Sequence, residues 1–95
     1  MSASNGAFRA LADPTRRRIL ELLARKDLTA GEIAEQFPIA FASVSRHLAL
    51  LKDAGLVEAE REGQFIRYRL NTTVYQEVVR YLMKVLKRGG GELDA

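Results

Sequence analysis

The sequence predicts a winged helix-turn-helix domain, mainly α-helical, with about five helices and a two-stranded β-hairpin as the wing. Helical patterns at 29–37 and 41–54 are separated by only a few residues, which is the spacing of a helix-turn-helix. Strand-like runs at 56–59 and 65–70 then follow on either side of a turn at 61–64 that contains a glycine. Together these features predict the wing.

The bulk composition limits the classes of protein to which the chain can belong. Its 95 residues are expected to form one domain, 1–95, small enough that a second copy would usefully extend its core. The chain has no cysteine and one histidine, which excludes disulfides, thiol redox sensing and thiolate metal ligation. A net charge of +3 fits nucleic-acid binding but equally fits simple solubility. The placement of the charges must decide between them.

Composition also gives expectations about location and chemistry. No apolar run approaches the roughly 20 residues that span a bilayer, so no membrane insertion is expected. The N-terminus lacks the basic and apolar regions of a signal peptide, which favours a cytoplasmic protein. The single histidine has no cysteine, paired carboxylates or phosphate-binding loop beside it. We therefore expect no catalysis and no cofactor.

The first two helices are predicted to meet at Asp13 and Pro14. The apolar run at 7–12 stops there because a residue before proline avoids the helical region. Asp13 can cap a second helix that has Pro14 at its first position and runs to about Lys26. Arginines at 16–18 are unfavourable to the dipole at the start of this helix, so phosphate contacts or salt bridges are expected to use their charge.

Local signals also predict where the next two helices begin and end. Thr29 and Glu32 have the spacing of a capping box, and the helix that they begin ends before Pro38. Apolar residues recur every three or four positions along 41–54, which predicts the second helix of the helix-turn-helix. Gly55 is expected to end it in a left-handed conformation.

The last helix is predicted to need more than one partner. It begins after the capping side chains of 71–73, and apolar residues between Val74 and Leu86 cover more than one stripe. Three of its residues could line a small-molecule site, although residues of this kind at helical spacing are more often core or interface: Tyr75, Tyr81 and Met83. The glycine-rich tail at 89–95 is expected to be disordered.

Several segments resemble the ArsR family of winged helix-turn-helix transcriptional regulators. They are LADPTRRRIL at 11–20, TAGEIA at 29–34, VSRHL at 44–48, LKDAGLV at 51–57 and EGQ at 62–64. The resemblance covers nearly the whole chain and is strongest to a cysteine-free branch of autorepressors. It implies a dimeric winged helix domain that represses its own operon.

The resemblance also implies a subunit interface formed by the first and last helices. The residues assigned to it are Phe8, Leu11, Val78, Leu82 and Val85. Metal-sensing members carry paired cysteines on the third helix or Asp and His ligands on the last, and the segments 32–37 and 73–79 lack both sets. A metal site is therefore not expected, and any inducer is expected to be a protein or a small organic molecule.

The helix-turn-helix predicts that the 41–54 helix enters the DNA major groove. Arg46 is assigned to a base edge because arginine is the usual bidentate reader of guanine, and Ser43 and Ser45 to positioning or readout. His47 has either a structural or a DNA-contacting role, since a metal ligand would need partners that the sequence does not provide. The alternative is that these residues only form a solvent-exposed helix face and contact no DNA.

The start of this helix departs from the family pattern. Residues 40–42 read Ala-Phe-Ala, where members more often carry a serine cap followed by polar residues. Phe41 could touch a thymine methyl group or pack against the preceding helix. The family pattern therefore does not predict which operator sequence this helix recognises.

The wing is predicted to touch the DNA backbone or minor groove through Arg61, Gln64 and Arg67. Strand alternation places Arg67 and Arg69 on one face, opposite two apolar neighbours, so the face is basic. The alternative is that these arginines contact only solvent, as exposed arginines do on any soluble hairpin.

These features predict a sequence-specific DNA-binding repressor that acts as a homodimer on an inverted-repeat operator, controls its own gene and senses no metal. Expected partners are double-stranded DNA, a second copy of the chain, and a protein or small-molecule inducer. The alternative is a winged helix that binds another protein. An acidic 41–54 helix would favour that alternative, whereas Arg46, His47 and Lys52 do not.

Overall fold

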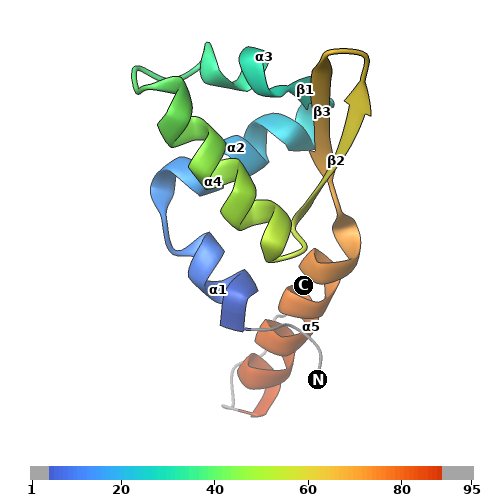
Figure 1. Cartoon of the computed structure of the whole chain (residues 1–95). Coiled ribbons are helices and arrows are strands. Elements are labelled where there is room, and N and C mark those ends of the chain that lie inside the picture. The colour runs from blue at the N-terminus through green and yellow to red at the C-terminus, as the bar shows by residue number, and fades with distance from the viewer. Residues whose placement is uncertain (1–4, 89–95) are drawn as a thin grey trace.

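The computed structural model describes residues 5–88 and has the predicted winged helix-turn-helix architecture (Figure 1). Its helices are α1 (Asn5–Leu11), α2 (Pro14–Arg25), α3 (Ala30–Ala34), α4 (Phe41–Asp53) and α5 (Thr72–Arg88). Its strands are β1 (Leu28–Thr29), β2 (Val57–Glu62) and β3 (Phe65–Leu70). Figure 1 shows the tip of the β2–β3 hairpin at one end of the molecule and α1 and α5 at the other. The tail predicted to be disordered, 89–95, lies outside the described residues.

The core forms where α2, α3 and α4 meet the start of the hairpin. In α4, Val44, Leu48 and Leu51 are fully buried, and their spacing of three and four residues places them on one face. Buried apolar residues from the other elements complete the interior: Ala7, Ala10, Ile19, Leu20, Leu23, Ile33, Leu56, Val57 and Val78. This packing fixes which side of α4 stays exposed to solvent.

The sheet contains a third strand that the sequence analysis did not predict. Strand β1 pairs antiparallel with β3, which places Leu28 opposite Tyr68 and Thr29 opposite Arg67. The strand order is therefore β1-β3-β2. Two residues are too few to show alternation, so only the partner strand reveals them. This pairing attaches the wing to the start of α3.

The turn of the hairpin is shorter than the predicted turn at 61–64. Strand β2 continues through Glu62, which lies opposite Phe65, and only Gly63 and Gln64 connect the strands. Gly63 has a φ of 63°, a left-handed conformation that glycine adopts without steric cost.

The predicted helix caps are confirmed. Asp13 accepts a hydrogen bond from the backbone N–H of Arg16 at 3.0 Å. The Thr29 hydroxyl accepts from the N–H of Glu32 at 3.2 Å, and the Glu32 carboxylate accepts from the N–H of Thr29 at 2.8 Å. Asn71 accepts from the N–H of Thr73 at 3.1 Å before α5 begins. Each side chain satisfies a donor that the helix leaves unpaired.

Gly55 ends α4 as predicted, with a φ of 80°. The N–H of Leu56 donates to the carbonyl of Leu51 and that of Gly55 donates to Lys52, each at 3.0 Å, which is a Schellman motif. A Cβ atom on Gly55 would lie 3.0 Å from Cγ2 of Val74. Glycine thus provides both the left-handed turn and the close approach of α5.

Arg16 joins three helices. Its Nε donates to the carbonyl of Ala10 at 2.9 Å and its Nη2 to that of Arg9 at 3.2 Å, so it caps the last turn of α1. Its Nη1 lies 3.3 Å from Nδ1 of His47 in α4. Because a guanidinium only donates, this contact is a hydrogen bond when Nδ1 of the imidazole carries no proton.

The two other arginines of the predicted basic run also have partners. Arg17 donates to the carbonyl of Leu11 at 2.8 Å, and Arg18 forms a salt bridge with Glu21 at 3.2 Å. The sequence predicts either phosphate contacts or salt bridges for these arginines, and within residues 5–88 only Arg18 of the three forms a salt bridge. Arg16 and Arg17 cap α1, a role that needs the fold to bring the first two helices together.

Replacing Arg16 with alanine should lower the free energy of unfolding by about 1–3 kcal/mol, because three acceptors lose a charged donor. Arg18→Ala is the matched control and should change it by less than about 1 kcal/mol, since its pair is exposed on the surface. Urea unfolding at one fixed protein concentration measures both. Equal effects of the two variants would contradict the linking role of Arg16.

Stability should fall in acid partly through Asp13. The backbone N–H of Arg16 holds the pKa of Asp13 below its ordinary value of 3.8, so the unfolded chain takes up the proton first. This contribution is present above pH 3.8 and is lost as the pH falls through the lower folded value. Asp13→Asn keeps a capping oxygen without titrating, and its unfolding free energy should depend less steeply on pH. Identical slopes for the two proteins would contradict this role.

Candidate nucleic-acid interface

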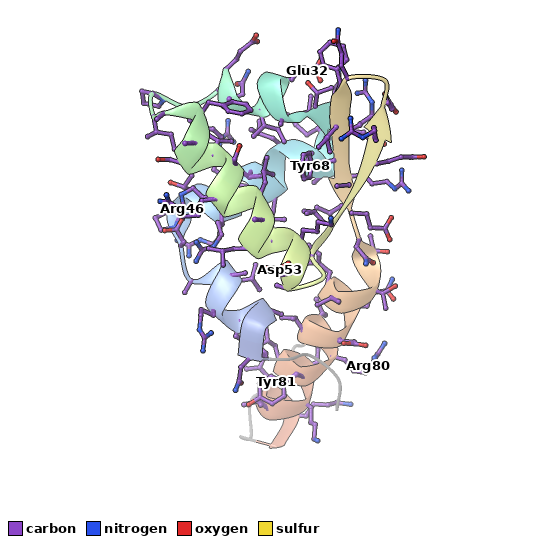
Figure 2. All side chains as sticks on the ribbon, in the orientation of Figure 1. Glu32, Arg46, Asp53, Tyr68, Arg80 and Tyr81 are labelled. Carbon is purple, nitrogen blue, oxygen red and sulfur yellow. The ribbon has the colours of Figure 1, made fainter. Side chains whose placement is uncertain are left out.

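The exposed side of α4 carries positive charge that no carboxylate of the described chain neutralises. Arg46 lies on this side, and Figure 2 shows it on the flank of α4 that faces away from the hairpin. The sequence has no acidic residue from Phe41 to Lys52. None of the salt bridges formed within residues 5–88 involves Arg46. The side chain is therefore available to a base or a phosphate.

The two predicted serines differ in accessibility. Ser45 is exposed beside Arg46, whereas Ser43 is half-buried. Both lie in the first half of α4, which is the part of such a helix that meets base edges. Their assignment to DNA stays a prediction, with Ser45 better placed to make the contact.

His47 faces the interior of the domain. Its Nδ1 lies 3.3 Å from Arg16 and 3.9 Å from the carboxylate of Asp13, and its side chain is 21% exposed. Of the roles predicted for this residue, the geometry supports the structural one. His47 connects α4 to the junction between α1 and α2, and thereby helps to fix the angle at which α4 is presented.

The wing is less basic than predicted, because its arginines face glutamates. Arg67 forms a salt bridge of 2.8 Å with Glu62, and Arg69 bonds Glu58 at 3.1 Å. The register places Glu58 directly opposite Arg69, whereas Glu62 lies diagonally from Arg67, within reach of its long side chain. The sequence analysis weighed the arginines without the glutamates of the opposing strand.

Arg61 and Gln64 are the accessible predicted residues of the wing. Arg61 is exposed and donates only to the carbonyl of Gly63, at 3.3 Å, among residues 5–88. Gln64 is exposed in the turn. Arg67 is bonded to Glu62, so Arg61 is the arginine of the wing that pairs with no carboxylate among residues 5–88.

The residues assigned to the subunit interface fall into two groups. Val78 is only 5% exposed and packs inside the protomer, and Leu11 packs against the core. Leu82 and Val85 are 50% and 48% exposed. Phe8 is half-buried, with its ring edge-on to that of Tyr81 at a centroid distance of 5.6 Å. Little of Val78 is therefore left for a partner.

An apolar surface runs along α5. Its exposed residues are Val79, Tyr81, Leu82, Met83, Val85 and Leu86. Figure 2 shows Tyr81 on the side of α5 toward α1 and Arg80 on the opposite side. This α5 apolar surface matches the expectation that the last helix needs a second partner.

The three residues considered for a small-molecule site do not line one cavity. Tyr75 borders a hollow between α2 and β3 together with Leu20 and Leu70. Tyr81 instead contacts Phe8, and Met83 is exposed. Within residues 5–88, no three potential metal ligands lie together, and no helix is long and apolar enough to cross a membrane.

Comparison with known proteins agrees with this geometry. A family model described as a bacterial regulatory protein of the arsR family matches residues 13–59. The transcriptional repressor SdpR of Bacillus subtilis (strain 168) is 47% identical over 94% of this chain and 99% of its own length. A probable mercury resistance operon repressor of Streptomyces lividans is 46% identical over 64% of this chain. The aligned region makes up only 49% of that protein.

Solved structures show the same fold. A crystal structure of an ArsR family transcriptional regulator aligns with a TM-score of 0.86 and 31% identity, over 93% of this chain and 97% of that chain. The similarity to the repressor SdpR over nearly the whole chain confirms the predicted resemblance to the ArsR family. Family and relatives are regulators of transcription and not enzymes. The chain therefore belongs to the ArsR family of bacterial DNA-binding transcriptional repressors.

Proposed function

We propose that the protein acts as a homodimer that represses its own gene by binding an inverted-repeat operator, and that it senses no metal. The observation that carries the proposal is the exposed, acid-free side of α4, where Arg46 has no partner among residues 5–88. Each subunit would insert α4 into a major groove, with half-sites about one helical turn apart. The bound repressor would then block access of RNA polymerase to the operator.

The two ends of the molecule suit different tasks. Arg46 and Ser45 would meet base edges, while Arg61 and Gln64 would meet the flanking backbone or minor groove. At the opposite end, the α5 apolar surface would pack against its copy around Leu82 and Val85. This arrangement leaves the DNA-facing residues free on both subunits.

The scarcity of metal-binding side chains supports a regulator that does not sense a metal. It has no cysteine, and its one histidine is already bonded to Arg16. Release from DNA would come from a protein or small organic molecule. Repression of its own gene is supported by the resemblance to the autorepressor branch.

The competing function is a winged helix that binds another protein. The same unpaired Arg46 could meet an acidic partner, whereas the apolar α5 favours pairing of two copies in either case. Selective binding to DNA decides between the two functions.

Arg46→Ala should weaken binding to DNA from upstream of the protein's own gene by about 1–3 kcal/mol and should blunt the preference for it over scrambled DNA. Fluorescence anisotropy at two salt concentrations measures both effects. Arg69→Ala is the matched control: it removes the same charge, but from a residue already bonded to Glu58 and Glu60, and should change affinity little.

Equal losses for these two variants would show that Arg46 reads no base. Equal weak binding of the unaltered protein to both DNAs would instead favour the protein-binding alternative.

Leu82→Glu should convert the dimer into monomers, because it places a charge within the α5 apolar surface. Arg80→Glu is the control on the opposite side of the same helix and should leave the dimer intact. Light scattering gives the mass of each variant, and circular dichroism checks that both remain helical. A Leu82→Glu protein that stays dimeric would show that the interface lies elsewhere.

A further inference from the structure

The start of α4 is exposed yet carries no side chain that can form a hydrogen bond. Five consecutive residues share this property: Pro38, Ile39, Ala40, Phe41 and Ala42. The Phe41 side chain is 55% exposed and lies outside the buried core. Phe37, by contrast, is partly buried and packs against the core. The packing alternative considered for Phe41 therefore does not explain why an aromatic ring lies here.

We propose that Phe41 reads the 5-methyl group of thymine in the operator. This inference rests on the proposed function and adds the base chemistry that α4 recognises. In a helix-turn-helix, the N-terminal residues of the second helix contact base edges in the major groove. The methyl group of thymine is the apolar group that a base edge offers there. A helix start without hydrogen-bonding side chains discriminates between bases through this group.

The surroundings of Phe41 suit DNA as the occupant. The exposed side of α4 is free of acidic residues until Asp53, so this helix itself adds no negative charge that would repel a phosphate. Ala40 and Ala42 flank the ring with single methyl groups, which allow a base edge to approach it. Arg46 follows about 7.5 Å farther along the helix axis. A thymine and a guanine are therefore expected close together within one half-site.

A second exposed aromatic residue provides an internal control. Phe65 is 58% exposed, similar to Phe41, but it lies beside the hairpin turn opposite Glu62. Phe65→Ala removes the same side chain without touching α4. Phe41→Leu keeps an apolar group of smaller size at the position in question.

The experiment begins with full-length protein and a library of random-sequence duplexes, from which the preferred site is selected. Each thymine of the selected duplex is then replaced in turn by deoxyuridine, which differs only in lacking the methyl group. Fluorescence anisotropy gives the affinity. Loss of one buried methyl should weaken binding roughly fourfold at one thymine of a half-site, and roughly 15-fold when both half-sites are changed.

The effect should depend on Phe41. Phe41→Ala should bind thymine and deoxyuridine duplexes equally, Phe41→Leu should retain part of the difference, and Phe65→Ala should retain all of it. An unaltered protein that binds the selected site but is insensitive to deoxyuridine at every position overturns this inference and leaves the repressor proposal standing. A difference that persists in Phe41→Ala overturns it too, because another residue then reads the methyl. Failure to select any preferred sequence overturns both proposals.

Discussion

The guanidinium of Arg16 connects three helices, α1, α2 and α4, above the core that buries one side of α4. This one group satisfies the last carbonyls of α1, extends from the first turn of α2 and reaches His47 in α4. A lysine could not contact three acceptors in these directions, because its single ammonium lacks the planar fork. This guanidinium thereby links α1, which lies beside α5 at one end of the molecule, to α4 (Figure 1).

Charge is distributed unevenly between the two parts that we propose approach DNA, α4 and the wing. On the wing, Arg69 bonds Glu58 directly opposite it, and Arg67 bonds Glu62, which lies diagonally across the strand pair. Much of the positive charge of the wing is therefore neutralised within the protein. On α4, Arg46 has no such partner among residues 5–88. Under the proposed function, we therefore expect sequence discrimination to depend on the helix and the wing to contribute mainly through Arg61.

Features set by neighbouring residues could be predicted from the sequence, and features set by distant residues could not. The caps at Asp13 and Thr29 and the left-handed Gly55 follow from local geometry, and all three are confirmed. Strand β1 has only two residues and is defined by β3, which lies almost 40 positions later. The site shows the same division. Arg46 is exposed because its helix has an apolar side, which periodicity shows, but the bond of His47 to Arg16 joins residues 31 positions apart.

Methylation of the bound operator tests the central claim, that two copies of α4 lie in successive major grooves of an inverted repeat. Dimethyl sulfate attacks N7 of guanine in the major groove and N3 of adenine in the minor groove. We expect protection of one guanine N7 in each half-site, at symmetric positions about 10 base pairs apart. Protection confined to adenine N3, or to one side of the site only, would contradict the account.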